Sequence, residues 1–168
     1  MNADRVILYA EDDENDAFLF QHALSRADIG RRLVIVPNGR SAIEYLSGTG
    51  AYADRTQYPL PSLVLLDVKM PVLSGLDVLK WIRSSPAHAK LAVFMMTSSN
   101  EDSDIRRAYS EGVDGYLVKP NKVDDLVQMI RSLEKHWLSQ NRSSPGASPE
   151  AKLAAGGHLI GGDIQPDL

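Results

Sequence analysis

Short apolar runs alternate along the chain with segments of helical periodicity, and the alternation occurs five times. The expected strands are 5–10, 32–37, 62–67, 92–97 and 115–118. After the first run, Ala17, Phe20 and Leu24 are spaced by three and four residues, as in a helix with one face on a sheet. Alternating β and α units predict an α/β fold, a parallel sheet with helices on both faces. Because crossovers are right-handed, the simplest such fold is flavodoxin-like, with five strands in the order 2-1-3-4-5.

The other helices and loops follow from the same kind of pattern. Further helices are expected at 39–47, from about Ser74-Gly75, at 101–111 and from Val123 to about Trp137. The helix at 101–111 has little to bury beyond Ile105, Ala108 and Tyr109. It is therefore either a weakly held moving part or a plain solvent-facing helix. The segment 47–61 is rich in glycine and proline and is expected to be a long surface loop.

Composition and charge exclude several classes of protein. The chain has 168 residues, 43% of them hydrophobic, which fits one domain (1–139) and a flexible Gly/Ala/Pro/Ser-rich tail (140–168) without a separate output domain. A net charge of −4 argues against nucleic acid as a partner. No apolar run approaches the ~20 residues of a membrane span, and the first run is too short for a signal peptide. The expected location is the cytoplasm. Without cysteine, disulfides and thiolate metal sites are excluded.

Four of the predicted strands end in polar groups that carry chemistry. The pair Glu11-Asp12 ends the first run, Asp67 the third, Thr97 the fourth and Lys119 the fifth. In an open parallel sheet the carboxyl ends of the strands share one edge, where ligands bind. We therefore expect these groups to converge on one site.

The chemistry of the converging groups indicates phosphoryl transfer to an aspartate. Two unit charges ~4 Å apart repel by about 4 kcal/mol at an effective dielectric constant near 20, so three carboxylates call for a cation. Oxygen ligands with open water positions suit Mg²⁺. With two carboxylates on the metal, the third can act as the nucleophile. Thr97 and Lys119 would bind the remaining phosphoryl oxygens.

The chain resembles the response-regulator receiver domain of two-component systems over about residues 4–138. The segments that carry the resemblance are Glu11-Asp12, Leu65-Leu66-Asp67-Val68-Lys69-Met70-Pro71-Val72-Leu73-Ser74-Gly75, Met96-Thr97-Ser98 and Tyr116-Leu117-Val118-Lys119-Pro120. The resemblance implies that Asp67 is the phosphoacceptor and that the donor is the phosphohistidine of a sensor histidine kinase. It implies Mg²⁺ ligands at Glu11, Asp12, Asp67 and the backbone carbonyl of Lys69.

The same resemblance assigns roles to residues around the acceptor. Thr97 and Tyr116 would be the switch pair, and Lys119 the lysine that contacts the phosphoryl group. Lys69 and Ser99 occupy the two positions where the family tunes the lifetime of the phosphorylated state, although Lys69 has an equal claim to be a solvated lysine. The Lys119–Pro120 bond is implied to be cis. Trp137 continues the apolar stripe of the last helix and is expected to pack against the domain.

A narrower resemblance is to the stand-alone receivers that partner phytochrome-type histidine kinases. The separation from Asp12 to Asp67 is 55 residues, longer than in compact receivers, with the excess in the loop 47–61. The run Ser98-Ser99-Asn100-Glu101 and the ending Glu134-Lys135-His136-Trp137-Leu138 also fit this subtype. It implies a light-linked or similar sensor kinase as donor and a homodimer of receivers. Signalling would pass by protein–protein contact or by onward phosphotransfer.

Two rival functions share part of this pattern. Haloacid-dehalogenase-type phosphatases also form an aspartyl phosphate. Their motif has a second acid two residues after the nucleophile, which serves as the general acid, and this chain has Lys69 at that position. A receiver-like module that has lost phosphorylation is the other rival, and the presence of every expected site residue argues against it. The chain is therefore interpreted as a phosphoacceptor signalling protein rather than an enzyme.

Overall fold

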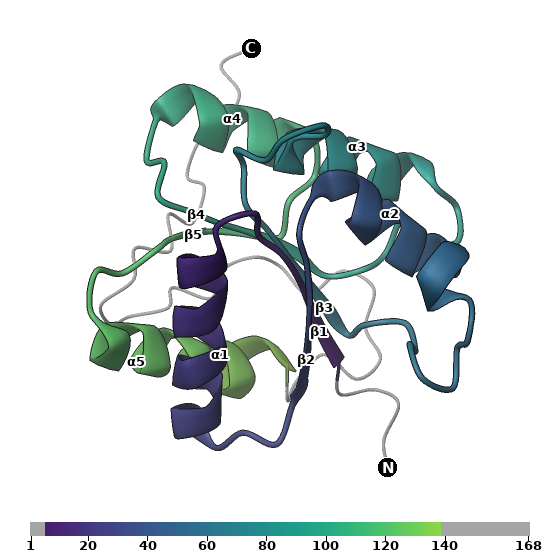
Figure 1. The fold of residues 1–168 in the computed structure, drawn as a ribbon. Coiled ribbons are helices and arrows are strands. Elements are labelled where there is room, and N and C mark those ends of the chain that lie inside the picture. Colours follow the sequence, from purple (N-terminus) through teal and green to yellow (C-terminus); the bar gives the residue numbers. More distant parts are fainter. Residues whose placement is uncertain (1–5, 139–168) are drawn as a thin grey trace.

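The computed structural model describes residues 6–138, and within this range five parallel strands form one sheet (Figure 1). The strands are β1 Val6–Ala10, β2 Arg32–Val36, β3 Leu63–Leu66, β4 Val93–Thr97 and β5 Gly115–Val118. Their order is β2-β1-β3-β4-β5, so the predicted flavodoxin-like fold is confirmed. Strand β1 lies between β2 and β3, with Tyr9 opposite both Ile35 and Leu65.

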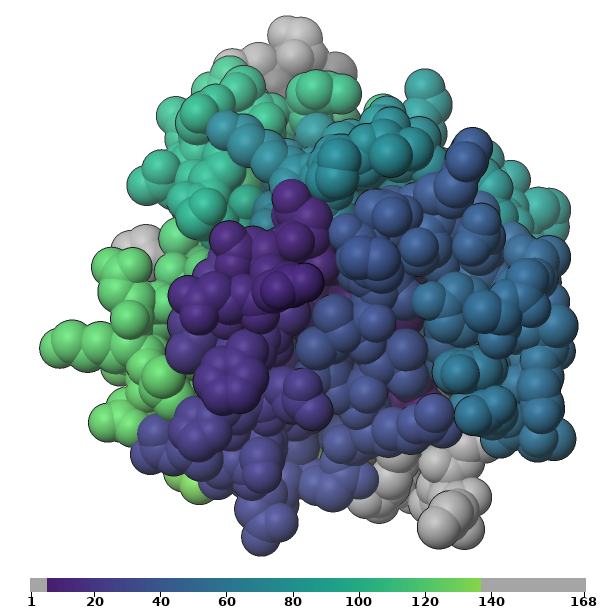
Figure 2. All heavy atoms as spheres, viewed as in Figure 1, coloured from purple at the N-terminus to yellow at the C-terminus, as the bar shows by residue number. Residues whose placement is uncertain are grey.

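Helices cover both faces of the sheet. The described helices are α1 Glu14–Ala27, α2 Gly39–Ser47, the 3-10 turn η2 Gly50–Tyr52, α3 Gly75–Ser84, α4 Asp102–Ser110, α5 Val123–Leu133 and the π-helical turn η3 Glu134–Leu138. Helices α1 and α5 pack on one face, and α2, α3 and α4 on the other (Figure 1). From the same side, the space-filling view shows the segments from α1 through α2 side by side on the near surface of the molecule (Figure 2).

Two apolar cores follow from the alternation of side chains along the strands. In β1, Ile7 and Tyr9 pack in the core beneath α1 and α5, whereas Leu8 and Ala10 pack beneath α2 and α3. All five side chains of β1 are buried, which is the environment of a central parallel strand. Because the buried strands are parallel and neighbouring, they end at the same edge of the sheet. The polar residues at their ends lie close together there.

The turn between β3 and α3 brings the start of α3 against the residue that follows β3. A Cβ at Gly75 would lie 2.1 Å from the carbonyl oxygen of Asp67, so a side chain there would push α3 away. Ser74 begins the helix with a capping box: its hydroxyl accepts from the Asp77 N–H, and the Asp77 carboxylate accepts from the Ser74 N–H. These contacts hold the segment after Asp67 in one geometry.

The segment 47–61 is a mostly exposed surface loop, as predicted, but it contains the turn η2 and packs against α2. Its Arg55 donates hydrogen bonds to the carbonyl oxygens of Tyr45 and Tyr58, at 2.7 and 3.1 Å. The rings of Tyr52 and Tyr58 lie 5.2 and 6.0 Å from the ring of Tyr45. Spaced tyrosines within a breaker-rich segment show no helix or strand period, so the sequence did not indicate this packing.

The remaining predictions about the fold have mixed outcomes. In α4 the buried residues are Ile105 and Ala108, as the pattern predicts, while motion of this helix stays a prediction. The cis prediction for Lys119–Pro120 is wrong, because the peptide bonds of the described residues are all trans. Trans is the lower-energy form even before proline, by about 0.5–1 kcal/mol. The tail 140–168 and the side chain of Trp137 lie outside the described part of the structure.

Candidate functional site

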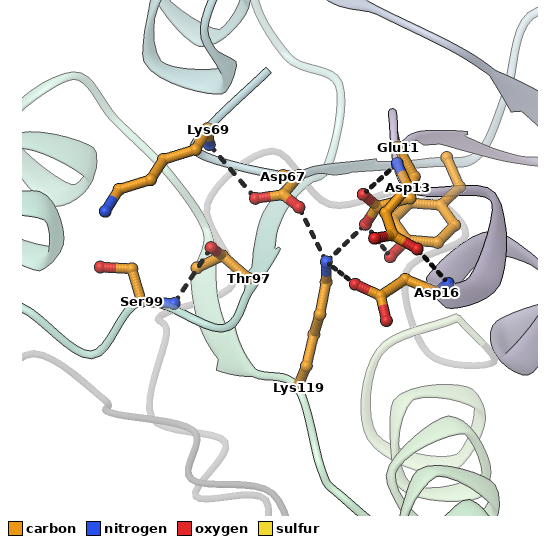
Figure 3. A network of polar contacts seen from close by, with 9 residues as sticks. Glu11, Asp13, Asp16, Asp67, Lys69, Thr97, Ser99 and Lys119 are labelled. Atoms are coloured by element: carbon orange, nitrogen blue, oxygen red, sulfur yellow. Dashed lines mark hydrogen bonds and ion pairs between the residues drawn. The ribbon is translucent and has the colours of Figure 1, made fainter.

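The predicted site residues meet at the carboxyl edge of the sheet (Figure 3). Glu11 follows β1 and is 3% exposed, and Asp67 follows β3 and is 6% exposed. Thr97 is the last residue of β4 and is buried, and Lys119 follows β5. Parallel pairing places these strand ends side by side, so the convergence expected from the sequence is confirmed.

Three carboxylates lie close enough to share a cation. One carboxylate oxygen from each of Glu11, Asp12 and Asp67 lies within 4.8 Å of the others. Asp12 is exposed, whereas the other two are buried, so one side of the cluster opens to solvent. Carboxylate oxygens with room for water suit a hard divalent cation such as Mg²⁺. The Lys69 N–H donates to Asp67 Oδ1 at 3.2 Å, which orients the Asp67 carboxylate.

The ammonium group of Lys119 contacts three carboxylates at once. Its Nζ lies 2.7 Å from Asp67 Oδ2, 2.5 Å from Glu11 Oε2 and 2.9 Å from Asp16 Oδ2. Burial by itself would lower the pKa of the ammonium, but the hydrogen bonds to Asp67, Glu11 and Asp16 outweigh burial and raise the pKa of Lys119 above its ordinary value. Lys119 is therefore a permanent cation in the site.

Glu11 is held by hydrogen bonds to both of its carboxylate oxygens. The buried hydroxyl of Tyr9 donates to Oε2 at 2.8 Å, and the Asp13 N–H donates to Oε1 at 3.1 Å. Burial raises the pKa of Glu11, while the hydrogen bond from Lys119 acts in the opposite direction. Burial and the neighbouring Glu11 carboxylate likewise raise the pKa of Tyr9, so its hydroxyl keeps its proton and remains a donor. Glu11 thus has one fixed orientation.

Sequence reasoning missed two members of this network, Tyr9 and Asp16. Tyr9 looks like any apolar strand residue, and its hydroxyl becomes relevant only because β1 aims it at Glu11. Asp16 lies four residues after Asp12, which is one helical turn, so a helix that starts at once could return it to the same edge. That spacing was the available signal for Asp16.

Thr97 and Tyr116 both contact the loop between β4 and α4. The hydroxyl oxygen of Thr97 accepts from the Ser99 N–H at 3.2 Å, and the Tyr116 hydroxyl donates to the Ser99 carbonyl oxygen at 2.8 Å. Tyr116 is fully buried, and burial raises its pKa to about 12. Both residues of the predicted switch pair therefore meet at Ser99 rather than acting at separate places.

Lys69 and Ser99 each contact an acid at the start of α4, and these two contacts form a bridge from the site to that helix. The Lys69 ammonium is 3.8 Å from Glu101 Oε1, with both side chains mostly exposed. The Ser99 hydroxyl donates to Asp104 Oδ2 at 2.8 Å, in the first turn of α4. An open hollow of about 600 Å³ adjoins this bridge, and its lining includes Asp12, Lys69 and Arg107. The hollow gives the exposed side of the carboxylate cluster an approach from solvent.

Comparison with known proteins gives a consistent picture over most of the chain. The sequence model of the response regulator receiver domain matches residues 7–131. The probable methanogenesis regulatory protein FilR2 of Methanothrix harundinacea is 35% identical over 144 residues, which cover 84% of this chain and 88% of that protein. The response regulator Rcp1 of Synechocystis is 33% identical over 137 residues, covering 82% of this chain and 91% of Rcp1.

Solved structures agree with the sequence relatives. The response regulator RPA3017, from red light signaling of R. palustris, superposes with a TM-score of 0.76 at 36% identity, over 84% of this chain and 99% of that one. The phosphorylated cyanobacterial phytochrome response regulator RcpA gives 0.73 at 32% identity, over 81% and 95%. The Mn²⁺-bound form of Rcp1 gives 0.71 at 32% identity, over 84% and 99%.

Within residues 6–138, each helix is too short or too polar to cross a lipid bilayer. The predicted cytoplasmic location stays a prediction.

Proposed function

Because this chain belongs to the response regulator receiver family, we propose that it is a two-component phosphoacceptor that takes a phosphoryl group on Asp67. The observation that supports the proposal best is the 2.7 Å contact between Lys119 Nζ and Asp67 Oδ2, at the edge of a carboxylate cluster. A fixed cation beside the acceptor is placed to stabilise the charge that develops on the transferred group.

A divalent cation completes this site. Receiver domains bind Mg²⁺ or Mn²⁺ at an acidic pocket, and the oxygens of Glu11, Asp12 and Asp67 form such a pocket here. We assign these three residues and the backbone carbonyl of Lys69 as the Mg²⁺ ligands. When bound, the cation supplies charge neutralisation and a contact for a phosphoryl oxygen.

The transfer needs little covalent chemistry from the protein. A bond forms between an Asp67 carboxylate oxygen and phosphorus, while the bond between phosphorus and the donor imidazole nitrogen breaks and the imidazole leaves with the electron pair. Lys119 gives up its hydrogen bond to Asp67 and donates to a phosphoryl oxygen, and the Thr97 hydroxyl donates to another. These residues act by position and charge, so the protein promotes its own phosphorylation and dephosphorylation and is otherwise not an enzyme.

The contacts at Ser99 support a route from the site to α4. In the structure the Thr97 hydroxyl accepts a hydrogen bond from the Ser99 N–H. When this hydroxyl turns toward the phosphoryl group, that hydrogen bond is lost. Tyr116 donates to the carbonyl oxygen of the same residue, so a movement of the loop would either carry Tyr116 with it or break this hydrogen bond. We assign Thr97 and Tyr116 as the switch pair on this basis. Lys69 and Ser99 border the acceptor and are assigned to tuning the phosphoryl lifetime.

The proposed donor is a sensor histidine kinase. RPA3017 and RcpA, which act in red light signaling and as a phytochrome response regulator respectively, support a phytochrome-type kinase. FilR2 is as similar in sequence and is a probable methanogenesis regulator, so the subtype rests on the structural relatives. The homodimer implied by this subtype, and output through protein contact or onward phosphotransfer, stay predictions.

The test is the intact mass of the full chain after incubation with Mg²⁺ and acetyl phosphate, for the wild type and Asp67→Asn. We expect the wild type to gain the mass of one phosphoryl group, with no gain in EDTA and none in the mutant. A gain that persists in Asp67→Asn would place the acceptor elsewhere. If the wild type gains no mass from acetyl phosphate or from the phosphorylated kinase domains of phytochrome-type sensors, the proposed function is wrong.

A further inference from the structure

Asp16 contacts Lys119, the lysine beside the proposed acceptor, although Asp16 lies outside the carboxylate cluster that would hold the metal. Its Oδ2 is 2.9 Å from Lys119 Nζ, and the side chain is 37% exposed, compared with 12% for Lys119. We propose that Asp16 positions Lys119 for phosphoryl transfer, as the partner that holds the ammonium group before, during and after the reaction. The inference rests on the proposed function of Asp67.

A count of hydrogen bonds shows why such a partner is needed. A lysine ammonium has three N–H donors, and here they face Glu11, Asp67 and Asp16. Phosphorylation turns the Asp67 carboxylate into an acyl phosphate, so that N–H moves to a phosphoryl oxygen. Glu11 shares its charge with the cation when the metal binds. Asp16 undergoes neither change, so it remains a full carboxylate partner throughout.

The local structure fixes Asp16 at this position. Asp13 is the N-cap of α1, and its side chain accepts a hydrogen bond from the Asp16 N–H at 3.0 Å. This bond fixes the backbone of Asp16 in the first turn of the helix. An exposed ion pair between two mobile side chains contributes little. This pair differs because Lys119 is mostly buried and is also held by two other carboxylates, so the contact with Asp16 completes a fixed orientation of the ammonium group.

The competing interpretation is that Asp16 merely adds an acid to the first turn of α1, where the helix dipole favours negative charge. Glu14 separates the two interpretations. It is an exposed acid in the same turn, and among the described residues the ion-pair partners of Lys119 are Glu11, Asp16 and Asp67. Glu14→Gln therefore removes the same charge from the same turn without touching the lysine.

The experiment compares Asp16→Ala, Asp16→Asn and Glu14→Gln in the full chain. Rates of phosphorylation by acetyl phosphate are measured at saturating Mg²⁺, and the Mg²⁺ dissociation constant is measured without phosphodonor. We expect Asp16→Ala to slow phosphorylation roughly tenfold, since a displaced catalytic group lowers the rate even when the chemistry is intact. Asp16→Asn keeps an acceptor oxygen, so its phosphorylation rate should lie between those of Asp16→Ala and the wild type. The rate of Glu14→Gln should match that of the wild type. The Mg²⁺ dissociation constant should change no more in Asp16→Ala than in Glu14→Gln.

Two further measurements show whether Asp16 acts through Lys119. In a Lys119→Ala background, Asp16→Ala should slow the residual phosphorylation no further. In the wild-type background, NMR should show the Lys119 ammonium protons exchanging with water faster in Asp16→Ala than in Glu14→Gln. The proposal would be overturned if the Lys119 ammonium protons exchanged equally fast in Asp16→Ala and Glu14→Gln, or if Asp16→Ala were phosphorylated at the wild-type rate. It would also be overturned if Asp16→Ala slowed phosphorylation by the same factor with and without Lys119. The exchange measurement needs no phosphorylation, so it shows whether Asp16 holds Lys119 even if Asp67 proves not to be the acceptor.

Discussion

Lys119 Nζ lies 2.7 Å from Asp67 Oδ2, although the two residues are 52 positions apart in the chain. The contact joins the ends of β3 and β5, which flank β4 in the sheet. It places a cation whose pKa is raised against the carboxylate that would accept a phosphoryl group.

Replacement of the lysine separates its electrostatic role from its structural one. Lys119→Met should slow phosphorylation by acetyl phosphate by about 10²-fold, because a fixed cation at the transferred group is lost. The same change removes a positive charge from the carboxylates, so Mg²⁺ should bind more tightly. Both quantities can be measured by intact mass and calorimetry. Lys90→Met, at an exposed lysine, is the control, and an unchanged rate in Lys119→Met would contradict the assignment.

Mg²⁺ should stabilise the folded protein through the carboxylate cluster. A ligand that binds only the folded state adds about 2.7 kcal/mol at a concentration ~100 times its dissociation constant. We expect the melting temperature of the wild type to rise with Mg²⁺ and the rise to be mostly lost in Asp12→Asn. Asp12 is exposed, so this change leaves the core intact. Glu14→Gln should keep the full rise, and an equal rise in Asp12→Asn would remove Asp12 from the ligand set.

The hydrogen bond from Tyr116 to the Ser99 carbonyl should hold the β4–α4 loop. Tyr116→Phe leaves that partly buried carbonyl without its donor and should lower the free energy of unfolding by about 1 kcal/mol. Amide hydrogen exchange should become faster in the loop and in α4. Tyr45→Phe removes a similar 2.8 Å bond, to the Pro59 carbonyl, far from α4. It should cost similar stability and leave α4 exchange unchanged. If the amides of the loop and of α4 exchanged at the same rates in both variants, the hydrogen bond from Tyr116 would not hold the loop.

His88 should make the protein less stable in mild acid. Burial, and secondarily the charge of Arg55, hold the pKa of His88 below its ordinary value of 6.5. As the pH falls through that value, the unfolded chain takes up a proton that the folded chain resists, so folding stability is lost. Urea unfolding should therefore show a larger loss of stability between about pH 7.5 and pH 5.5 for the wild type than for His88→Gln. Parallel losses in the two proteins would show that His88 titrates alike in both states.

Val72 occupies a backbone conformation that β-branched residues avoid. Its φ is +70°, and the residue is 73% exposed in the turn between β3 and α3. Asparagine tolerates this left-handed region, so Val72→Asn should raise the free energy of unfolding by about 0.5–1 kcal/mol. Val72→Thr keeps the branched Cβ and should give no such gain. Denaturant unfolding of the two variants is the measurement, and equal stability would mean that the turn carries no strain.

The sequence by itself determined the fold and the main members of the site. Each of the runs before Glu11, Asp67, Thr97 and Lys119 is a buried parallel strand, and parallel strands share their carboxyl edge, so local pattern was enough to bring these groups together. The strand order followed from handedness and from short connections.

Tertiary structure alone decided which atoms meet and how the site is supported. Tyr9 and Asp16 join the network because of where β1 aims a hydroxyl and where α1 begins. The sequence carries no signal for the Tyr9 contact, and the spacing from Asp12 allows Asp16 to return to the same edge without showing that it contacts Lys119. The same holds for the tyrosine packing after α2 and for the meeting of Thr97 and Tyr116 at Ser99. Side-chain directions depend on contacts between residues that are distant in the chain, so only the tertiary structure decides them. The strands follow from the local sequence pattern and their order from the handedness of the crossovers, so both could be predicted from the sequence.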